Sequence, residues 1–352
     1  MKLNKFKMSM AVLLTAVLPF SNLWAEDRSS QNQDAEHRLS EMQNAYRKSN
    51  FELYFVKQSI ATAEPISFSH GVVDNRQYSH WLYLNGVPMG YFSAEEIIAY
   101  FRAGSQPELV ERGVPPFLIG RFNTVSLDKV YSNYVPVSVG RNRIAGRNVF
   151  MIRLSPKKND RYGYVLYIDE ITKILLQADV VNPTDGQMVE SYMATHFVNT
   201  SEPNKIIQKI NEAYLNDPVI IEMTSRGHDV SDSGEGEAAV TDTGKNKRAE
   251  EVRKLGWGLS YVPSGYELVK IERNSITDQN SEAEHLLYTD GLSDLSVYRI
   301  KALEGSEYPV VKQGITNLFR YRADPYEIVV VGDIPVETEK KIAESYSVPG
   351  NN

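Results

Sequence analysis

The fold is decided by the stretch VFMIRLSPKKNDRYGYVLYIDEITKILLQADVVNPTDGQMVESYMATHF, residues 149–197. It contains four runs rich in β-branched and aromatic residues, which favour strands; they span 149–154, 162–168, 174–181 and 188–197. Typical turn residues separate the runs at 159–160, 169–173 and 183–186. Because connections this short join antiparallel neighbours, the stretch predicts an antiparallel meander.

Upstream of this meander the sequence predicts one helix and then further strands. Leu39, Met42 and Tyr46 recur at helical spacing, and Asp34 can cap the N-terminus of that helix. Strand patterns follow at 51–60, 65–74, 78–84 and 89–92. Asn85-Gly86 predicts a tight hairpin between the last two of these strands, with positive φ at both turn positions.

Residues 93–101 fit two structures. Ser93 and Glu96 have the spacing of a capping box, which favours a helix. The alternation of Ile97, Ala99 and Phe101 with their neighbours allows a strand. Both possibilities stay open at this point.

Downstream of the meander the chain predicts a linker and a second domain. Residues 204–215 form an amphipathic pattern that predicts a helix. Residues 224–250 are rich in Gly, Ser, Asp and Glu, which predicts a flexible linker because such a segment buries too little apolar surface to order itself. Strand patterns at 267–273, 285–289, 293–300 and 327–331, with a helix at 336–346, predict a small α+β domain. The predicted boundaries are 26–223 for the large domain and 251–348 for the small one.

The N-terminus predicts secretion. Lys2, Lys5 and Lys7 precede an apolar run over 8–20, and Ala25 fits a cleavage position. The run is too short to span a bilayer, which needs about 20 residues. Residues 1–25 are therefore expected to be a cleaved signal peptide, and the mature protein is expected to be secreted.

The composition excludes several classes of function. The chain has no cysteine, which excludes disulfides, thiol catalysis and cysteine-ligated metals. Its net charge is −7, and loss of the three signal lysines leaves an acidic protein that is not expected to bind nucleic acid. The six histidines form no zinc-binding pair, and no nucleophile elbow or phosphate loop occurs. We therefore expect no enzymatic activity, no metal and no cofactor.

One basic cluster stands out in this acidic chain. Arg141, Arg143 and Arg147 fall within seven residues, flanked by Gly140 and Gly146. Guanidinium groups match phosphate and carboxylate geometry, so the cluster is a candidate site for an anion or for the partner. In one strand of period two, all three would share a face. The alternative is a solvated edge strand whose charges block edge pairing.

The same segment carries a resemblance to a known family. YSNYVPVSVGRNRIAGR at 131–147 resembles the RseB/MucB family of periplasmic regulators of the sigma-E envelope stress response. Further matches follow in order on both sides of the linker: RYGY at 161–164, DEITKILLQA at 169–178, YTDGL at 288–292, VVGDIP at 330–335 and KIAE at 341–344.

The resemblance implies a fold and a function. The large domain should be a half-open antiparallel β-barrel like that of lipoprotein carriers, with helices on the concave face, and residues 87–100 should be strand. The protein should bind the periplasmic part of an RseA/MucA-like membrane-anchored anti-sigma factor and shield it from proteolysis. Lipopolysaccharide or another lipid should release that factor, and homo-oligomers are possible.

A periplasmic lipid or lipoprotein carrier is the rival function. An apolar cavity enclosed by the 149–197 meander would suit acyl chains in either case. The second domain favours the regulator, since a simple carrier needs no second module.

Overall fold

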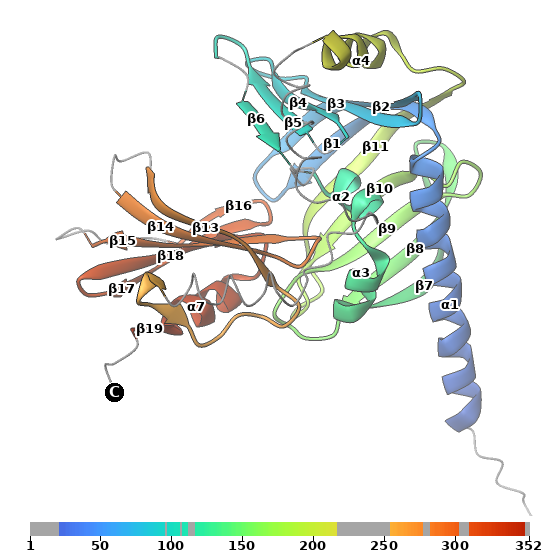
Figure 1. Ribbon diagram of the computed structural model, residues 1–352. Helices are drawn as coiled ribbons and strands as arrows, with labels where there is room; N and C mark the ends of the chain where they lie inside the picture. The colour runs from blue at the N-terminus through green and yellow to red at the C-terminus, as the bar shows by residue number, and fades with distance from the viewer. Residues whose placement is uncertain are drawn as a thin grey trace, which may run out of the picture.

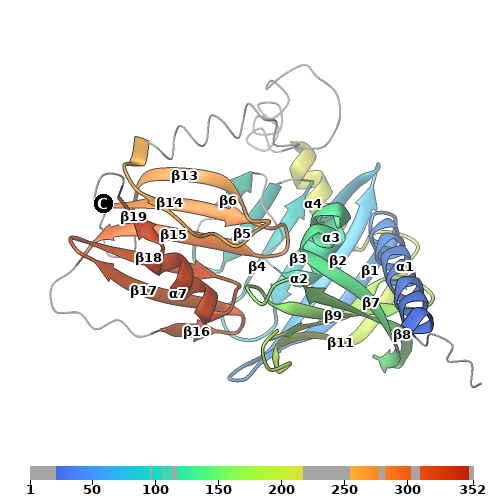
Figure 2. The same cartoon turned by 90° about the horizontal axis from the view of Figure 1, so that it is seen from below.

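The computed structural model describes residues 21–95, 97–105, 108–111, 117–216, 254–276, 282–302 and 310–348. Two antiparallel sheets organise these residues, and they lie side by side in Figures 1 and 2. The predicted linker lies outside the described residues, as does the predicted signal peptide up to residue 20; residues 21–25 begin the first helix. None of the helices in the described ranges is both long and apolar enough to cross a membrane.

The large sheet joins two meanders. Its strand order is β6-β5-β4-β3-β2-β1-β11-β10-β9-β8-β7, so β1 and β11 pair the two halves, and β6 and β7 are the edges. The strands of the first half are β1 (Asn50–Ser59), β2 (Ala63–Val73), β3 (Arg76–Tyr83), β4 (Met89–Ala94), β5 (Ile97–Arg102) and β6 (Glu108–Glu111). Those of the second are β7 (Tyr134–Ile144), β8 (Arg147–Pro156), β9 (Gly163–Asp169), β10 (Leu175–Val181) and β11 (Met188–Thr200). The predicted 149–197 meander is confirmed as β8 to β11.

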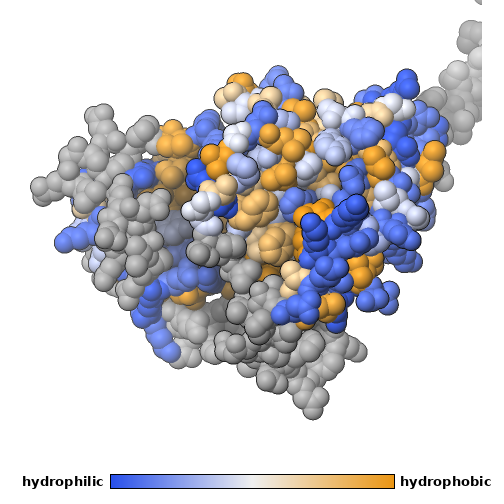
Figure 3. All heavy atoms as spheres, turned by 90° about the horizontal axis from the view of Figure 1, so that it is seen from above, coloured by the Kyte–Doolittle hydropathy of each residue, from blue (hydrophilic) through white to orange (hydrophobic). Residues whose placement is uncertain are grey.

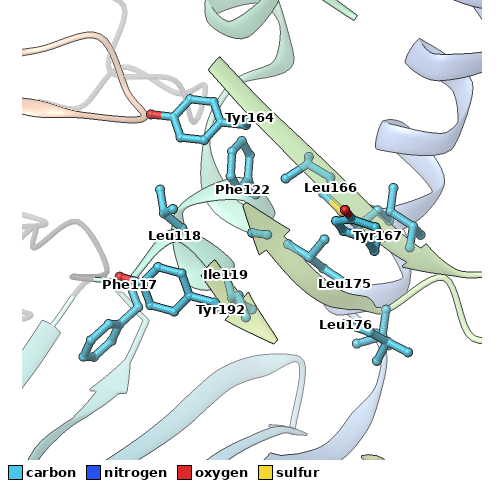
Figure 4. Close-up of a cluster of buried hydrophobic side chains, with 14 of the residues drawn as sticks. Phe117, Leu118, Ile119, Phe122, Tyr164, Leu166, Tyr167, Leu175, Leu176 and Tyr192 are labelled. Carbon is cyan, nitrogen blue, oxygen red and sulfur yellow. The ribbon is translucent and has the colours of Figure 1, made fainter. Parts of the chain in front are cut away.

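Helices fill the concave side of the second meander. α1 (Ser21–Tyr46) buries Leu39 and Met42 there, and α2 (Leu118–Thr124) and α3 (Leu127–Asn133) pack beside it. Figure 4 shows Ile119 and Phe122 of α2 among meander side chains such as Leu175. α4 (Lys205–Asn216) covers the opposite face of β2–β4. The expectation of a half-open sheet with helices on its concave face is confirmed.

The small domain is a separate six-stranded sheet of order β13-β14-β15-β18-β17-β16. Its strands are β13 (Glu267–Ile276), β14 (Glu282–Thr289), β15 (Asp294–Lys301), β16 (Val311–Gln313), β17 (Thr316–Ala323) and β18 (Tyr326–Gly332). α7 (Val336–Glu344) covers one face, and β12 (Gly258–Leu259) pairs with β19 (Tyr346–Ser347). The predicted α+β class is confirmed, although the sequence patterns missed β16 and β17.

Three local predictions need correction. Asp34 lies inside α1 rather than at its N-terminus, and its carboxylate instead binds Arg38 at 2.8 Å and Ser138 at 2.7 Å. Asn85 is not in the positive-φ region, because five residues, 84–88, connect β3 to β4 instead of a two-residue turn. Ser93 lies in β4, so the strand alternative holds for 93–101 and the capping box does not form.

Candidate functional site

A cavity of about 480 Å³ lies between the two domains. Its volume falls within the range of about 300–1,000 Å³ that is typical of small-molecule sites. The large domain contributes Lys57, Tyr83, Met89, Gly90, Tyr91, Tyr100, Phe101, Arg102, Ser105, Phe117, Glu190 and Tyr192. The small domain contributes Gln313, Ile315, Thr316 and Asp333, mostly from the β16–β17 hairpin. We call this cavity the interdomain pocket.

Aromatic rings build one wall of the interdomain pocket. Phe117 precedes α2 and stacks on the buried Trp81 with ring centroids 3.6 Å apart and planes 10° apart. The Tyr91 ring lies 5.6 Å from Phe117, and Tyr192 meets Phe117 edge-on at 6.3 Å. Figure 4 shows Phe117 and Tyr192 close together beside α2. Rings packed against one another hold fixed positions, so the wall is preformed for an apolar ligand.

The pocket also has a charged side. Lys57 Nζ lies 3.4 Å from a Glu64 oxygen and 3.8 Å from a Glu190 oxygen. Burial raises the pKa of Glu190, which the nearby ammonium of Lys57 only partly offsets. Burial also raises the pKa of Tyr83 from its ordinary value of 10 to about 12. The pocket therefore combines an apolar wall with a few fixed polar groups.

Apolar side chains continue from the pocket to the molecular surface. Leu84 and Val87 of the β3–β4 connection and Met89 at the start of β4 are exposed, and Met89 also lines the pocket. On the face shown in Figure 3, small apolar patches lie among hydrophilic residues. A ligand entering beside Met89 would thus meet an apolar rim.

The cavity differs from the one predicted from the sequence. The concave face of β8–β10 is packed against α1 and α2, and Leu166, Leu175 and Val180 are buried in that core. The interdomain pocket instead lies against β3–β5 and β11. Of residues 149–197, only Glu190 and Tyr192 line the interdomain pocket, so this pocket is not the one predicted from the sequence.

The structure divides the three predicted arginines. On the β7–β8 hairpin, Arg141 lies opposite Phe150 and Arg143 opposite Asn148, so these two share a face. Arg147 lies opposite Ile144 and belongs to the other face. The expectation that all three share a face is wrong, because the turn at Ala145-Gly146 ends the strand before Arg147.

Arg147 has a structural partner. Its Nε and Nη2 donate to the two Asp169 carboxylate oxygens at 2.7 and 3.0 Å. Burial alone raises the pKa of Asp169, but the hydrogen bonds from Arg147 and Thr172 leave it below its ordinary value. Asp169 Oδ1 also accepts from the N–H groups of Ile171 and Thr172, as expected for a turn.

Arg141 takes part in a cationic cluster that sequence spacing missed. The guanidinium of Arg38 lies 3.3 Å from the Phe150 ring centroid, Arg141 5.3 Å and Lys173 Nζ 5.5 Å. Arg141 also pairs with Glu170 at 3.0 Å and is 72% exposed. The cluster joins three segments that are far apart in the sequence: α1, the β7–β8 hairpin and the β9–β10 turn. Spacing within any one of these segments could not have predicted it.

Comparisons with known proteins agree with the fold. The MucB/RseB N-terminal domain matches residues 34–215, and the MucB/RseB C-terminal domain matches 251–347. The sigma-E factor regulatory protein RseB of Escherichia coli K12 is 26% identical over 87% of this chain and 88% of its own length. RseB of Haemophilus influenzae is 23% identical over 93% and 95%. The solved complex of Pseudomonas aeruginosa MucA and MucB covers 90% of this chain and 99% of the matched chain, with a TM-score of 0.65 and 20% identity.

Proposed function

The chain belongs to the MucB/RseB family, and from this premise we propose that it is a periplasmic negative regulator of the sigma-E envelope stress response. It binds the periplasmic part of a membrane-anchored anti-sigma factor and protects that factor from proteolysis. The observation that carries the proposal is the match to both family domains in order. The match to this chain extends over nearly the whole length of relatives that are named as regulators of sigma-E or of AlgU.

Two further features support parts of the proposal. MucB has been solved in complex with the periplasmic part of MucA, a protein partner of the proposed kind. The signal-like N-terminus supports export to the periplasm. The protein acts by binding rather than by catalysis.

The interdomain pocket supports lipid sensing. Its aromatic wall suits acyl chains, and its position between the domains lets a bound lipid act on both. We assign to lipopolysaccharide, or to another lipid, the role of releasing the anti-sigma factor.

The test is affinity capture from envelope extract with the purified full chain. We expect the anti-sigma factor to be retained, to resist added protease while bound, and to be released by lipopolysaccharide. Retention of lipid without any protein partner would instead establish the carrier function.

We also propose that Arg141 and Arg143 contribute to an anion or partner site, with Arg147 supporting the hairpin that carries them. Arg143→Ala should weaken the retained complex by about one to two decades, since a charge-assisted contact is worth about 1.5–3 kcal/mol. Arg147→Ala should instead lower stability, because it removes the cationic partner of the buried Asp169 carboxylate. Arg153→Ala, an exposed arginine on β8, is the matched control. Equal affinity for Arg143→Ala, Arg141→Ala and this control would make the cluster purely structural.

A further inference from the structure

Two turns of the small domain end inside the core of the large domain. Leu292, in the β14–β15 turn, and Ile315, in the β16–β17 turn, are 1% and 7% exposed. Both belong to the same buried cluster as Phe117 and Val125 of the large domain. The small domain therefore inserts two apolar side chains into its neighbour.

The backbone of each turn lies against the large domain. Gly291 has φ +92°, and a Cβ there would lie 2.8 Å from Val125 Cγ2. Gly314 has φ +61°, and a Cβ there would lie 2.0 Å from an oxygen of the buried Glu190. Glycine is needed at both turns for the backbone angle and also for the close approach. Contacts this close define one docked position rather than a loose association.

Buried arginines of the large domain hold the β14–β15 turn and the carboxylates next to it. Arg121 of α2 donates to the Leu292 carbonyl at 2.9 Å and contacts Asp294 and Asp333 at 3.2 and 3.4 Å. Arg161 donates to Asp290 at 2.9 Å. Interfaces with this many polar contacts resemble those of partners that associate reversibly. The docked state is specific and yet suited to release.

The docked turns also complete the interdomain pocket. Ile315 and Thr316 line it directly after Gly314, and Gln313 lines it directly before. Glu190, which lines the pocket from the large domain, lies against Gly314 and accepts a hydrogen bond from the Ile315 backbone. Separation of the hairpin would remove one wall of the pocket.

We propose that the turns around Gly291 and Gly314 form a releasable latch, and that latch closure and pocket occupancy are coupled. This coupling rests on the proposed function, because it assumes that the ligand in the interdomain pocket is an amphiphile. A ligand that contacts both domains binds only the docked form, so it must favour docking by the same factor by which docking favours its binding. At a ligand concentration of 100 times Kd, the ratio of docked to undocked molecules rises about 100-fold.

The latch can be tested by distance measurements on the full chain. The protein has no cysteine, so spin labels attach only to cysteines that are introduced. We choose Lys48→Cys in the large domain and Lys340→Cys in the small domain, because both positions are exposed. We expect one narrow distance distribution in the otherwise unchanged protein. Gly291→Ala and Gly314→Ala should add a broad, longer component.

Gly256→Ala is the matched control. Gly256 has φ +71°, but a Cβ at this position would have no atom of the described residues within 4 Å, so this variant has the backbone strain without the interdomain clash. Ile315→Ala shortens the inserted side chain without backbone strain and should also broaden the distribution. Circular dichroism verifies that each variant is folded. The latch is refuted if the turn variants keep the narrow distribution, or if Gly256→Ala broadens it equally.

Dodecylphosphocholine below its micelle concentration tests the coupling. It should restore the narrow distribution in Ile315→Ala and bind that variant more weakly than it binds the unchanged protein by calorimetry. Equal affinity with unchanged distances, or no binding to the unchanged protein, would overturn the coupling. Capture of the anti-sigma factor is measured separately, so the proposed function can stand or fall independently of the latch.

Discussion

Single residues of one chemical type have different roles in this protein. Arg121 and Arg161 are buried and reach across to the small domain, whereas Arg147 holds a turn and Arg141 lies at the surface. A buried arginine with carboxylate partners is strongly destabilising to remove, because truncation leaves those partners buried and unpaired. The same substitution at an exposed arginine tests binding more directly.

His70 should make stability depend on pH. Its ring is buried between Tyr46 and Phe51, and Nδ1 contacts the Ser49 carbonyl at 2.9 Å. Burial lowers the pKa of His70 to about 4 from its ordinary value of 6.5. Because the unfolded chain takes up this proton first, the stabilisation is present above about pH 6.5 and is lost as the pH falls towards 4.

The difference between the pKa of His70 in the unfolded and in the folded protein corresponds to about 3 kcal/mol of stability. Urea titrations between pH 7 and 4 should show this loss, and His70→Gln should flatten that part of the profile. His37→Gln, at a side chain 73% exposed, should leave the slope unchanged. An equal slope in His70→Gln would mean that other groups cause the pH dependence.

Among the elements, α1 contributes most directly to closing the second meander. Leu39 and Met42 are almost completely buried against the strands, and Ala35 completes the same stripe. The meander offers an apolar concave face, which only a helix with a matching apolar stripe can cover. The packing of this helix fills the concave side of the second meander with side chains such as Leu39 and Met42.

Truncation of this stripe should therefore be costly. Met42→Ala should lower the free energy of unfolding by about 2–5 kcal/mol, the usual range for a large-to-small change in a core. Asn44→Ala, at an exposed position of the same helix, should change it by less than about 0.5 kcal/mol. Chemical denaturation measures both variants. A negligible effect of Met42→Ala would show that α1 is only loosely attached to the sheet.

At the scale of the whole molecule, the interface between the two sheet domains combines polar contacts with inserted apolar side chains. Asn317 of the small domain donates to the Tyr162 hydroxyl at 3.0 Å, and Lys129 pairs with Glu267 at 3.1 Å. These contacts, and the insertion of Leu292 and Ile315 into the large domain, do not involve the chain that connects the two domains. Association should therefore survive cleavage of the connecting chain.

Limited proteolysis tests the predicted boundaries at 26–223 and 251–348. The Gly-, Ser- and acid-rich composition of 224–250 should make this segment the preferred site of cleavage. Mass spectrometry should find two stable fragments, and gel filtration should show them eluting together. Cleavage at other positions, with 224–250 left intact, would contradict the predicted domain boundaries.

Local sequence determined much of this protein. The runs of β-branched and aromatic residues at 149–197 predicted the strands of the meander, because these residue types favour strands and typical turn residues separate the runs. The pattern over 204–215 predicted α4 for the corresponding reason at helical period. The ordered motifs in both domains resembled the family that the comparisons then identified.

Only the tertiary structure decided where the pocket lies and which arginine performs which role. Arg161 and Asp290 are 129 residues apart, and Arg121 and Asp294 are 173 apart. Spacing along the chain could not separate Arg147 from Arg143, because the carboxylate that pairs with Arg147, Asp169, belongs to another strand, β9. Periodicity reports only the local backbone. A pocket between domains depends on how the surfaces of the two domains dock, and no periodic pattern within either domain encodes that contact.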